Sequence, residues 1–236
     1  MEYISANSRG KFTNEWLDSR HSFSFGDYYN PQRMGFSSLR VINEDWVAAN
    51  GGFPMHGHRD MEIVTYVMQG ALSHKDSLGN GSTMRVGDVQ RMSAGRGILH
   101  SEFNHSADET VHLLQIWLLP TAMGIKPSYA QAYFPPAARQ GQLQLLVSAD
   151  GREGSLTMNT DANLYTSILT DHASVSYHVP AGRATYLHLA RGTLHVSSST
   201  GQQQALQAGD ALALRENVTL TLSSTDSGEF LLFDLP

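Results

Sequence analysis

Hydrophobic and polar residues alternate over many short stretches of this chain, with glycine, asparagine, aspartate and serine between them. The clearest stretches are rich in β-branched residues and lie at residues 62–68, 111–119, 185–189 and 218–222. Their length and composition are typical of strands in a sandwich or barrel. Residues 78–81, with the sequence Leu-Gly-Asn-Gly, predict a tight turn between two such strands.

Few segments of the chain have the spacing of apolar residues that an α-helix shows. No long segment repeats its apolar residues three and four positions apart, and the two best short candidates for a helix are residues 14–19 and 128–133. The pattern therefore predicts an all-β fold with minor helix.

Part of the chain repeats at a spacing of 122 residues. Gly70 and Gly192 each end an apolar stretch at this spacing. The Gly-Asp dipeptide at residues 87–88 recurs at residues 209–210, with no gap needed between the two matches. A strand, a glycine turn, a hairpin and a Gly-Asp turn that recur in one order indicate a duplicated β-barrel.

The duplication predicts two domains, which a length of 236 residues can accommodate. We place the boundary in the segment 121–129, where glycine and proline interrupt the alternating pattern. The predicted domains are residues 1–125 and residues 126–236.

Composition and charge narrow the class of protein. Hydrophobic residues make up 41% of the chain and charged residues 16%, which is enough apolar material for a sizeable core. Acidic residues outnumber basic ones, 22 to 16, and the net charge of −6 disfavours a nucleic-acid partner. The absence of cysteine excludes disulfides and thiolate metal sites. Without a signal-peptide pattern or an apolar run of about 18 residues, we expect a cytoplasmic protein with no membrane contact.

The histidines of the chain need a chemical explanation. Among 11 histidines, His56 and His58 are two positions apart, and His100 stands two positions before Glu102. Residues i and i+2 of a strand point to the same face, so each pair projects together. On facing strands of a barrel, the two pairs would surround one point with three imidazoles and a carboxylate. This donor set suits iron, nickel, copper, manganese or zinc better than calcium.

The repeat distinguishes this set from four ordinary polar residues. A shift by 122 residues maps the four, in order, onto His178, Pro180, Leu222 and Ser224. The second copy has lost most of the polar set, and a purely structural role gives no reason for that difference. We therefore predict that the first barrel binds a metal and that the second barrel is degenerate and metal-free.

The order of these motifs resembles the two motifs of the cupins, and in detail it is similar to the pirin family. The resemblance rests on His-Gly-His-Arg-Asp-Met-Glu at residues 56–62, Thr-Tyr-Val at 65–67 and Met-Ser-Ala-Gly-Arg-Gly-Ile-Leu-His-Ser-Glu at 92–102. It is strong from about residue 22 to 120 and thinner toward the C-terminus. The resemblance implies a bicupin, that is, two cupin β-barrels. It also implies one divalent transition metal in the first barrel, on His56, His58, His100 and Glu102.

The carboxylate ligand is an open choice. Many cupins use the glutamate of the first motif, which is Glu62 here, and Glu62 shares a face with the histidine pair if that strand is unbroken. Pirins are similar instead in using the glutamate after the second-motif histidine, which is Glu102. We favour Glu102 and expect Glu62 to orient an imidazole.

The resemblance implies a quercetin 2,3-dioxygenase (quercetinase), an oxidoreductase that cleaves flavonols with dioxygen. On this hypothesis the metal binds the flavonol 3-hydroxyl oxygen, and Glu102 takes the hydroxyl proton as a general base. Iron is the favoured metal, with nickel, copper, manganese, cobalt or zinc as alternatives. Two other hypotheses are a redox-gated regulator that binds a protein partner and a different small-molecule enzyme of the cupin class. We expect a monomer.

Other polar residues are expected to have structural roles. We expect His74 and Asp76, beside a hairpin turn, to make cross-strand hydrogen bonds, and at most one of His112 and Gln115 to face the barrel interior. The aromatic run at residues 20–29 fits either a stacking platform or core packing. Five histidines are expected at the surface or satisfied in the core: His21, His105, His172, His188 and His195.

Overall fold

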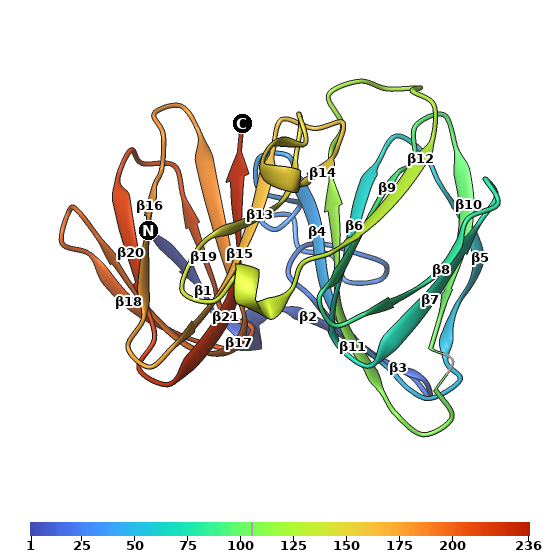
Figure 1. Cartoon of the computed structure of the whole chain (residues 1–236), viewed down its shortest axis with the longest axis horizontal. Coiled ribbons are helices and arrows are strands. Elements are labelled where there is room, and N and C mark those ends of the chain that lie inside the picture. Colours follow the sequence, from blue (N-terminus) through green and yellow to red (C-terminus); the bar gives the residue numbers. More distant parts are fainter. Residues whose placement is uncertain (105) are drawn as a thin grey trace. The chain divides into compact units, whose positions relative to one another are not determined.

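The computed structural model describes residues 1–104 and 106–236, which form strands joined by loops (Figure 1). The helices of this described part are short 3-10 turns: η1 (Ala6–Ser8), η2 (Pro136–Ala138) and η3 (Arg152–Gly154). The predicted all-β fold with minor helix is confirmed. Within the described residues, no helix has both the length and the apolar character that a membrane crossing needs.

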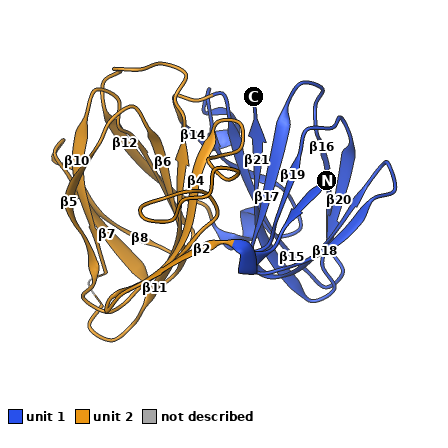
Figure 2. Cartoon of the chain, turned by 180° about the vertical axis from the view of Figure 1, so that it is seen from behind, with its two compact units in different colours: residues 1–8, 135–157, 161–236 blue, residues 9–134, 158–160 orange. Residues whose placement is uncertain are grey.

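The chain divides into two compact units, which Figure 2 shows in different colours. The N-terminal barrel comprises residues 9–134 and 158–160. The C-terminal barrel comprises residues 1–8, 135–157 and 161–236. Each barrel has its own buried core.

These bounds differ from the predicted division between residues 125 and 126, and strand pairing explains both differences. β1 (Glu2–Ile4) pairs antiparallel with β19 (Ala211–Leu214), which places the first residues in the C-terminal barrel. β12 (Ser128–Tyr133) pairs antiparallel with β9 (Asp88–Ser93), which keeps it in the N-terminal barrel. Both pairings join segments that are remote in sequence, so a local pattern does not indicate them.

The N-terminal barrel contains a seven-stranded and a four-stranded sheet. The larger sheet has the order β12-β9-β6-β11-β4-β3-β2, in which the strands not yet described are β6 (Glu62–Gln69), β11 (Val111–Leu118), β4 (Leu39–Val47), β3 (Leu17–His21) and β2 (Gly10–Thr13). The smaller sheet has the order β5-β10-β7-β8, with β5 (Gly52–His58), β10 (Ile98–Phe103), β7 (Ala71–Asp76) and β8 (Gly81–Arg85). Leu72 of the smaller sheet shares one buried cluster with Val67 and Leu113 of the larger sheet, so the two sheets pack face to face.

The C-terminal barrel is built on a ten-stranded sheet with the path β1-β19-β17-β21-β15-β13-β14, and β16, β18 and β20 pair off this path. Its strands are β13 (Gln144–Ser148), β14 (Leu156–Thr157), β15 (Asn163–Thr170), β16 (Ser174–His178), β17 (Ala184–Ser198), β18 (Gln203–Gln207), β20 (Thr219–Ser223) and β21 (Ser227–Leu235), besides β1 and β19. The long β17 pairs with β19 near its start and with β18 near its end, so it links two parts of the barrel. Leu187, Leu220 and Phe230 are among the fully buried side chains of its core.

The predicted strands are confirmed, since the four alternating stretches lie in β6, β11, β17 and β20. The two predicted helices are wrong. Residues 128–133 form β12, because pairing with β9 outweighs a weak local helical preference. In the other segment, the Asn14 side-chain oxygen accepts the backbone N–H groups of Trp16 and Leu17 at 3.0 and 2.8 Å, which makes a turn that leads into β3.

The repeated turns have the same construction in both barrels, which supports the duplication. Gly70 and Gly192 both have φ of +73°. In one Gly-Asp turn the Asp88 carboxylate accepts the Arg85 N–H at 2.7 Å, and 122 residues later the Asp210 carboxylate accepts the Gln207 N–H at 2.9 Å. The strands before these turns also correspond, because β6 lies between β9 and β11 as β17 lies between β19 and β21.

Gly192→Ala is expected to destabilise the protein by about 2–5 kcal/mol. A β-carbon at this position would lie 1.9 Å from the Ser227 carbonyl oxygen, and φ of +73° is unfavourable for alanine. Gly201→Ala is the matched control, because Gly201 also has positive φ, +86°, but a β-carbon there would meet no atom within 4 Å. The control should cost only about 1 kcal/mol. Denaturant unfolding measures both changes, and equal losses of stability would contradict the predicted clash.

Candidate metal centre

His56, His58 and His100 lie on two neighbouring strands of the smaller sheet. β5 and β10 pair antiparallel, with His100 directly opposite His56 and Ile98 opposite His58. The expectation that the two polar pairs lie on facing strands was wrong, because the strands are hydrogen-bonded neighbours. The three imidazoles still line one cavity, since positions two apart on each strand share a face.

A bulge separates His100 from Glu102 in the pairing of these strands. Glu102 pairs with Phe53, so β5 has one more residue than β10 between the two matched positions. Pro54 lies in this interval and has no N–H for the strand ladder. Glu102 nevertheless lines the same cavity as the three histidines.

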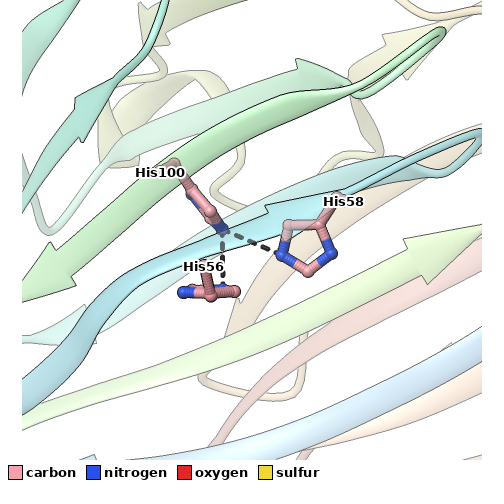
Figure 3. Close-up of side chains that lie close together, drawn as sticks. All are labelled: His56, His58 and His100. Carbon is pink, nitrogen blue, oxygen red and sulfur yellow. Dashed lines mark hydrogen bonds between the residues drawn. The ribbon is translucent and has the colours of Figure 1, made fainter.

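The three imidazoles approach one another through their Nε2 atoms (Figure 3). The Nε2 atom of His100 lies 3.0 Å from that of His56 and 2.9 Å from that of His58. The Nδ1 atom of His56 lies 2.8 Å from the Pro54 carbonyl oxygen. Nδ1–H therefore donates to this carbonyl, and the Nε2 of His56 keeps its lone pair. Nitrogen lone pairs that converge in this way fit a bound cation.

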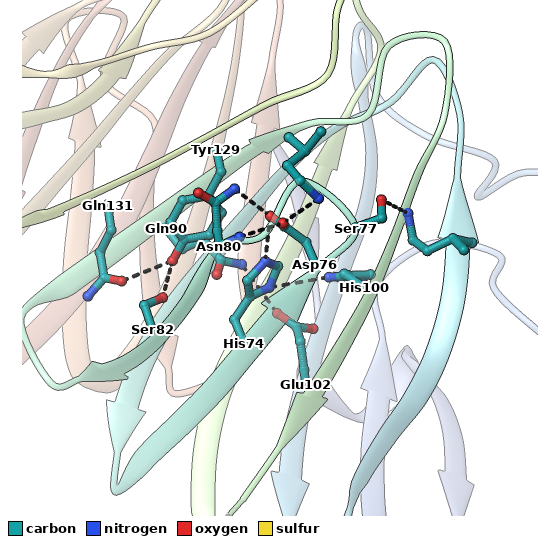
Figure 4. A network of polar contacts seen from close by, with 12 residues as sticks. His74, Asp76, Ser77, Asn80, Ser82, Gln90, His100, Glu102, Tyr129 and Gln131 are labelled. Atoms are coloured by element: carbon teal, nitrogen blue, oxygen red, sulfur yellow. Dashed lines mark hydrogen bonds and ion pairs between the residues drawn. The ribbon is translucent and has the colours of Figure 1, made fainter.

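His100 also contacts His74, which in turn contacts Asp76 (Figure 4). The Nδ1 atoms of His100 and His74 are 3.5 Å apart, and the Nε2 of His74 lies 3.2 Å from the Asp76 carboxylate. Because the carboxylate needs a donor, the proton of His74 is on Nε2, and its Nδ1 accepts from Nδ1–H of His100. His100 then presents an unprotonated Nε2 to the cavity. His74 thus makes the expected cross-strand bond, to His100 of β10, while its bond to Asp76 lies within β7. Asp76 also accepts the N–H groups of Leu78 and Asn80 in the following turn.

Burial favours the neutral form of His58 and His100. Desolvation, together with a smaller effect of the neighbouring His56, lowers the pKa of His58 to about 4. Desolvation also lowers the pKa of His100, with added effects from the nearby imidazoles. Neutral imidazole is the form that binds a metal, so the site is ready for a cation without losing protons.

Glu102 adds a buried carboxylate to this site. The amide of Gln115 donates to its Oε2 at 2.8 Å, and Gln90 and Thr65 approach its Oε1 at 3.3 Å each. Burial raises the pKa of Glu102 to about 7, although these hydrogen bonds act in the opposite direction. A carboxyl group with a pKa near neutrality can take up and release a proton under physiological conditions.

The potential donor atoms form two overlapping groups. His56, His58 and His100 are one group, and His74, His100 and Glu102 are the other, with the donor atoms of each group within 4.8 Å of one another. Figure 4 shows Glu102 beside His74 and His100. His100 belongs to both groups, and all four residues that the sequence suggested as ligands line the cavity. Among the described residues, no group joins Glu102 to His56 and His58 within that distance.

Glu62, the alternative carboxylate, has other partners. It accepts a hydrogen bond from the Ser93 hydroxyl at 2.6 Å and one from the Asn159 N–H at 3.3 Å. Its side chain is buried, and it does not belong to the described residues that line the cavity. This placement supports the choice of Glu102, and it shows no contact through which Glu62 would orient an imidazole.

The cavity beside the histidines has a volume of about 550 Å³ and largely aromatic walls. Trp117 meets the His58 ring edge to face, with ring centres 4.9 Å apart, and meets Phe25 in the same way at 5.3 Å. Tyr28 and Phe53 also line it. The aromatic run at residues 20–29 thus contributes to a cavity wall. A volume of this size is typical of a small-molecule site.

Several polar residues of the cavity were missed from the sequence. Gln115 faces the cavity, whereas His112 lies on the other face of β11 and contacts Glu44 at 2.9 Å. Asp45 lines the cavity as a fully buried carboxylate that accepts a hydrogen bond from Ser19. The signal that could have found them is the run of polar residues within an otherwise apolar strand, since such residues need a buried partner or a ligand.

Three of the remaining histidines are His21, His105 and His178. His21 was expected at the surface or satisfied in the core, but it lines the cavity, and its Nδ1 has no hydrogen-bond partner among the described residues. His105 lies outside the described residues. In the C-terminal barrel, the position equivalent to His56 is His178, an exposed residue whose Nδ1 lies 3.3 Å from the Thr219 hydroxyl.

Asp45→Asn is expected to stabilise the metal-free protein, and more so at pH 8 than at pH 5. Burial raises the pKa of Asp45 from 3.8 to about 7, so the folded state retains a proton that the unfolded state releases between these values. Folding stability therefore falls as the pH rises through this window, by up to about 4 kcal/mol. The amide removes this penalty and can still accept from Ser19. Urea unfolding at the two pH values tests the prediction, and an equal effect at both would contradict it.

Comparison with known proteins extends the resemblance to the whole chain. A family model described as pirin matches residues 4–118, and a model described as the quercetinase C-terminal cupin domain matches residues 145–235. The quercetin 2,3-dioxygenase of Escherichia coli (strain K12) is 43% identical over 238 residues, which cover 100% of this chain and 99% of that protein. The chain belongs to the pirin family. The bicupin fold predicted from the resemblance is confirmed for this pirin.

Solved structures of relatives have the same fold as this pirin. The structure of YhhW from Escherichia coli has a TM-score of 0.92 and 41% identity, and the match covers 100% of this chain and 97% of that chain. The bacterial pirin YhhW was also solved in complex with nickel(II), with a TM-score of 0.91 and 41% identity over 100% and 98% of the two chains. A putative quercetin 2,3-dioxygenase of Pseudomonas aeruginosa is 42% identical over 96% of this chain and 95% of that protein.

Proposed function

We propose that this pirin is a metal-dependent quercetin 2,3-dioxygenase that cleaves flavonols such as quercetin with dioxygen. The observation that carries the proposal is the convergence of three imidazoles on one point of a cavity that is also lined by the buried Glu102. The names of the relatives, at about 43% identity over the full length, support the same activity.

The proposed ligands of one divalent transition metal are His56, His58, His100 and Glu102. Their donor set of three imidazole nitrogens and a carboxylate oxygen fits such a metal, and the hydrogen bonds behind His56 and His100 already set the required tautomers. Iron is our favoured metal, while the nickel(II) complex of a relative supports nickel as an alternative. When bound, the metal would supply Lewis-acid and redox chemistry to a chelating flavonol.

Glu102 is the proposed general base. Its carboxylate lines the cavity and would take up the proton from the flavonol 3-hydroxyl group. The Gln115 amide fixes one carboxylate oxygen by donating to Oε2 at 2.8 Å, so the carboxylate keeps its orientation while the proton moves. The aromatic walls formed by Trp117 and Phe25 would hold a flat flavonol and exclude water from the reacting end.

Oxygen-dependent turnover of quercetin tests the proposal. Purified protein, loaded in turn with iron(II), nickel(II) and other divalent metals, is mixed with quercetin first without oxygen and then in air. We expect a shift in quercetin absorbance without oxygen, and loss of quercetin with release of carbon monoxide only in air. Binding without turnover in every metal form would contradict the enzyme and favour a regulatory binding protein.

A further inference from the structure

Five polar side chains cross the inner face of the larger sheet in one line. Directly paired residues on β9, β6, β11, β4 and β3 form this transverse polar row: Gln90, Thr65, Gln115, Asn43 and His21. Four of the five are buried, and an interior sheet face of this kind is normally apolar. The row therefore needs polar partners.

Glu102 accepts hydrogen bonds from one half of the row, although the Oε1 atom of Gln90 has no hydrogen-bond partner among the described residues. Gln90, Thr65 and Gln115 surround its carboxylate, and Gln90 also donates to the Thr65 hydroxyl at 3.0 Å. This half of the row belongs to the proposed metal site.

The other half of the row lies at the cavity wall and lacks hydrogen-bond partners for two atoms. Asn43 and His21 both line the cavity and are only 4% and 5% exposed. Neither the Oδ1 atom of Asn43 nor the Nδ1 atom of His21 has a hydrogen-bond partner in the described part of the chain. Buried polar atoms in native proteins are nearly always paired, so two unpaired atoms at a cavity wall indicate a ligand that pairs with them.

The next cross-strand pair adds a carboxylate to the same wall. Asp45 stands two residues after Asn43 on β4, lines the cavity, and pairs directly with Ser19 of β3. The Ser19 hydroxyl donates to one oxygen of this carboxylate. Because burial raises the pKa of Asp45 to about 7, the group is ionised above that pH, and it is then a strong acceptor for a phenolic hydroxyl of a ligand.

The remaining walls define the shape of the ligand. Phe25, Tyr28 and Trp117 line the cavity with aromatic rings, and such rings favour a flat aromatic ligand. An acceptor-rich wall beside aromatic walls thus selects a flat ring system that carries several hydroxyl groups. A simple apolar ring of the same size would leave the acceptors unpaired.

We propose that Asn43, Asp45 and His21 form a hydroxyl-recognition subsite, which selects polyhydroxylated flavonols over flavonols that have only the chelating hydroxyl and carbonyl groups. The inference rests on the proposed function for the flavonol class and adds the residues that choose among flavonols. Asn43 and Asp45 accept hydrogen bonds from phenolic hydroxyls that do not reach the histidines.

Anaerobic binding to the nickel(II)-loaded protein tests this subsite without turnover. Quercetin and 3-hydroxyflavone share the chelating groups, but only quercetin has further hydroxyls. We expect the wild-type protein to bind quercetin more tightly by on the order of tenfold, as measured from the shift in flavonol absorbance. This comparison needs no substitution, so it does not depend on the folding of a variant.

Substitutions on β4 then test which residues cause the tighter binding of quercetin. Asn43→Leu and Asp45→Asn should each raise the Kd of quercetin by on the order of tenfold and leave that of 3-hydroxyflavone within about twofold. Glu44→Gln is the matched control, because Glu44 is buried on the same strand but contacts Arg9 and His112 instead of the cavity. It should leave both Kd values unchanged, and thermal unfolding confirms that each variant is folded.

The outcomes separate this inference from the proposed function. Equal binding of the two flavonols by the wild-type protein, or equal loss of both in the Asn43 and Asp45 variants, would overturn the subsite even if quercetin is oxidised. The expected preference without oxidation in any metal form would support the subsite and overturn the dioxygenase.

Discussion

Glu102→Gln should lower the turnover of quercetin per bound metal by about 10²–10⁴-fold. The glutamine keeps the shape and one coordinating oxygen but removes the negative charge and the basicity. Gln115, Gln90 and Thr65 all donate to the carboxylate, so the amide oxygen of the glutamine keeps its donors. Its NH2 group needs an acceptor, which the Gln115 side chain provides when it turns its own amide oxygen toward it. Three imidazoles should still hold metal, although more weakly. The measurement compares initial rates at matched metal content.

Glu44→Gln again serves as the control for this substitution. It makes the same chemical change in a buried glutamate on the outer face of β4, where the partners are Arg9 and His112. Its turnover should stay close to that of the wild type. If fully loaded Glu102→Gln also oxidised quercetin at a near wild-type rate, Glu102 would not be the base, and the proton would leave by another route.

His100→Ala should reduce metal affinity by more than about 100-fold, and activity should fall with occupancy. Substitution of a residue that only orients a metal ligand lowers metal affinity by about 10–100-fold. His100 is itself a proposed ligand, so its loss should cost more. Its Nε2 is the atom that both His56 and His58 approach, and it also belongs to the group with Glu102. Elemental analysis after dialysis measures the metal that remains bound.

His178→Ala is the matched control for His100→Ala. His178 is an exposed histidine of the C-terminal barrel, at the position that the repeat equates with His56. Metal content and turnover should be unchanged in this variant. If His100→Ala kept one metal per chain and His178→Ala lost it, the metal would lie in the C-terminal barrel. That result would contradict the account.

Much of the fold could be predicted because burial of one strand face leaves a local trace. β11 shows it as alternation between buried and partly exposed positions. β6 is buried on both faces, and its β-branched content indicated it instead. The turn between β7 and β8 was indicated by glycine and asparagine. The errors arose where a remote partner decides the structure. Residues 128–133 become a strand only because β9 is beside them, and residues 2–4 join the C-terminal barrel only through β19.

The histidine cluster was predictable because positions two apart on a strand share a face, whichever strand lies beside it. The pairing of β5 with β10 and the bulge near Pro54 are tertiary features and could not be predicted. Asn43 and Asp45 were missed because β4 is buried on both faces. Glu44 between them is as buried as they are, so polarity alone does not reveal which residues face the cavity.

Anomalous X-ray diffraction from metal-loaded crystals tests the central claim most directly, because it locates the metal without reference to activity. We predict one anomalous peak per chain, at about 2.0–2.3 Å from the Nε2 atoms of His56, His58 and His100 and from a carboxylate oxygen of Glu102. A peak coordinated by Glu62 while Glu102 points away, or a peak at His178 in the C-terminal barrel, would contradict the account.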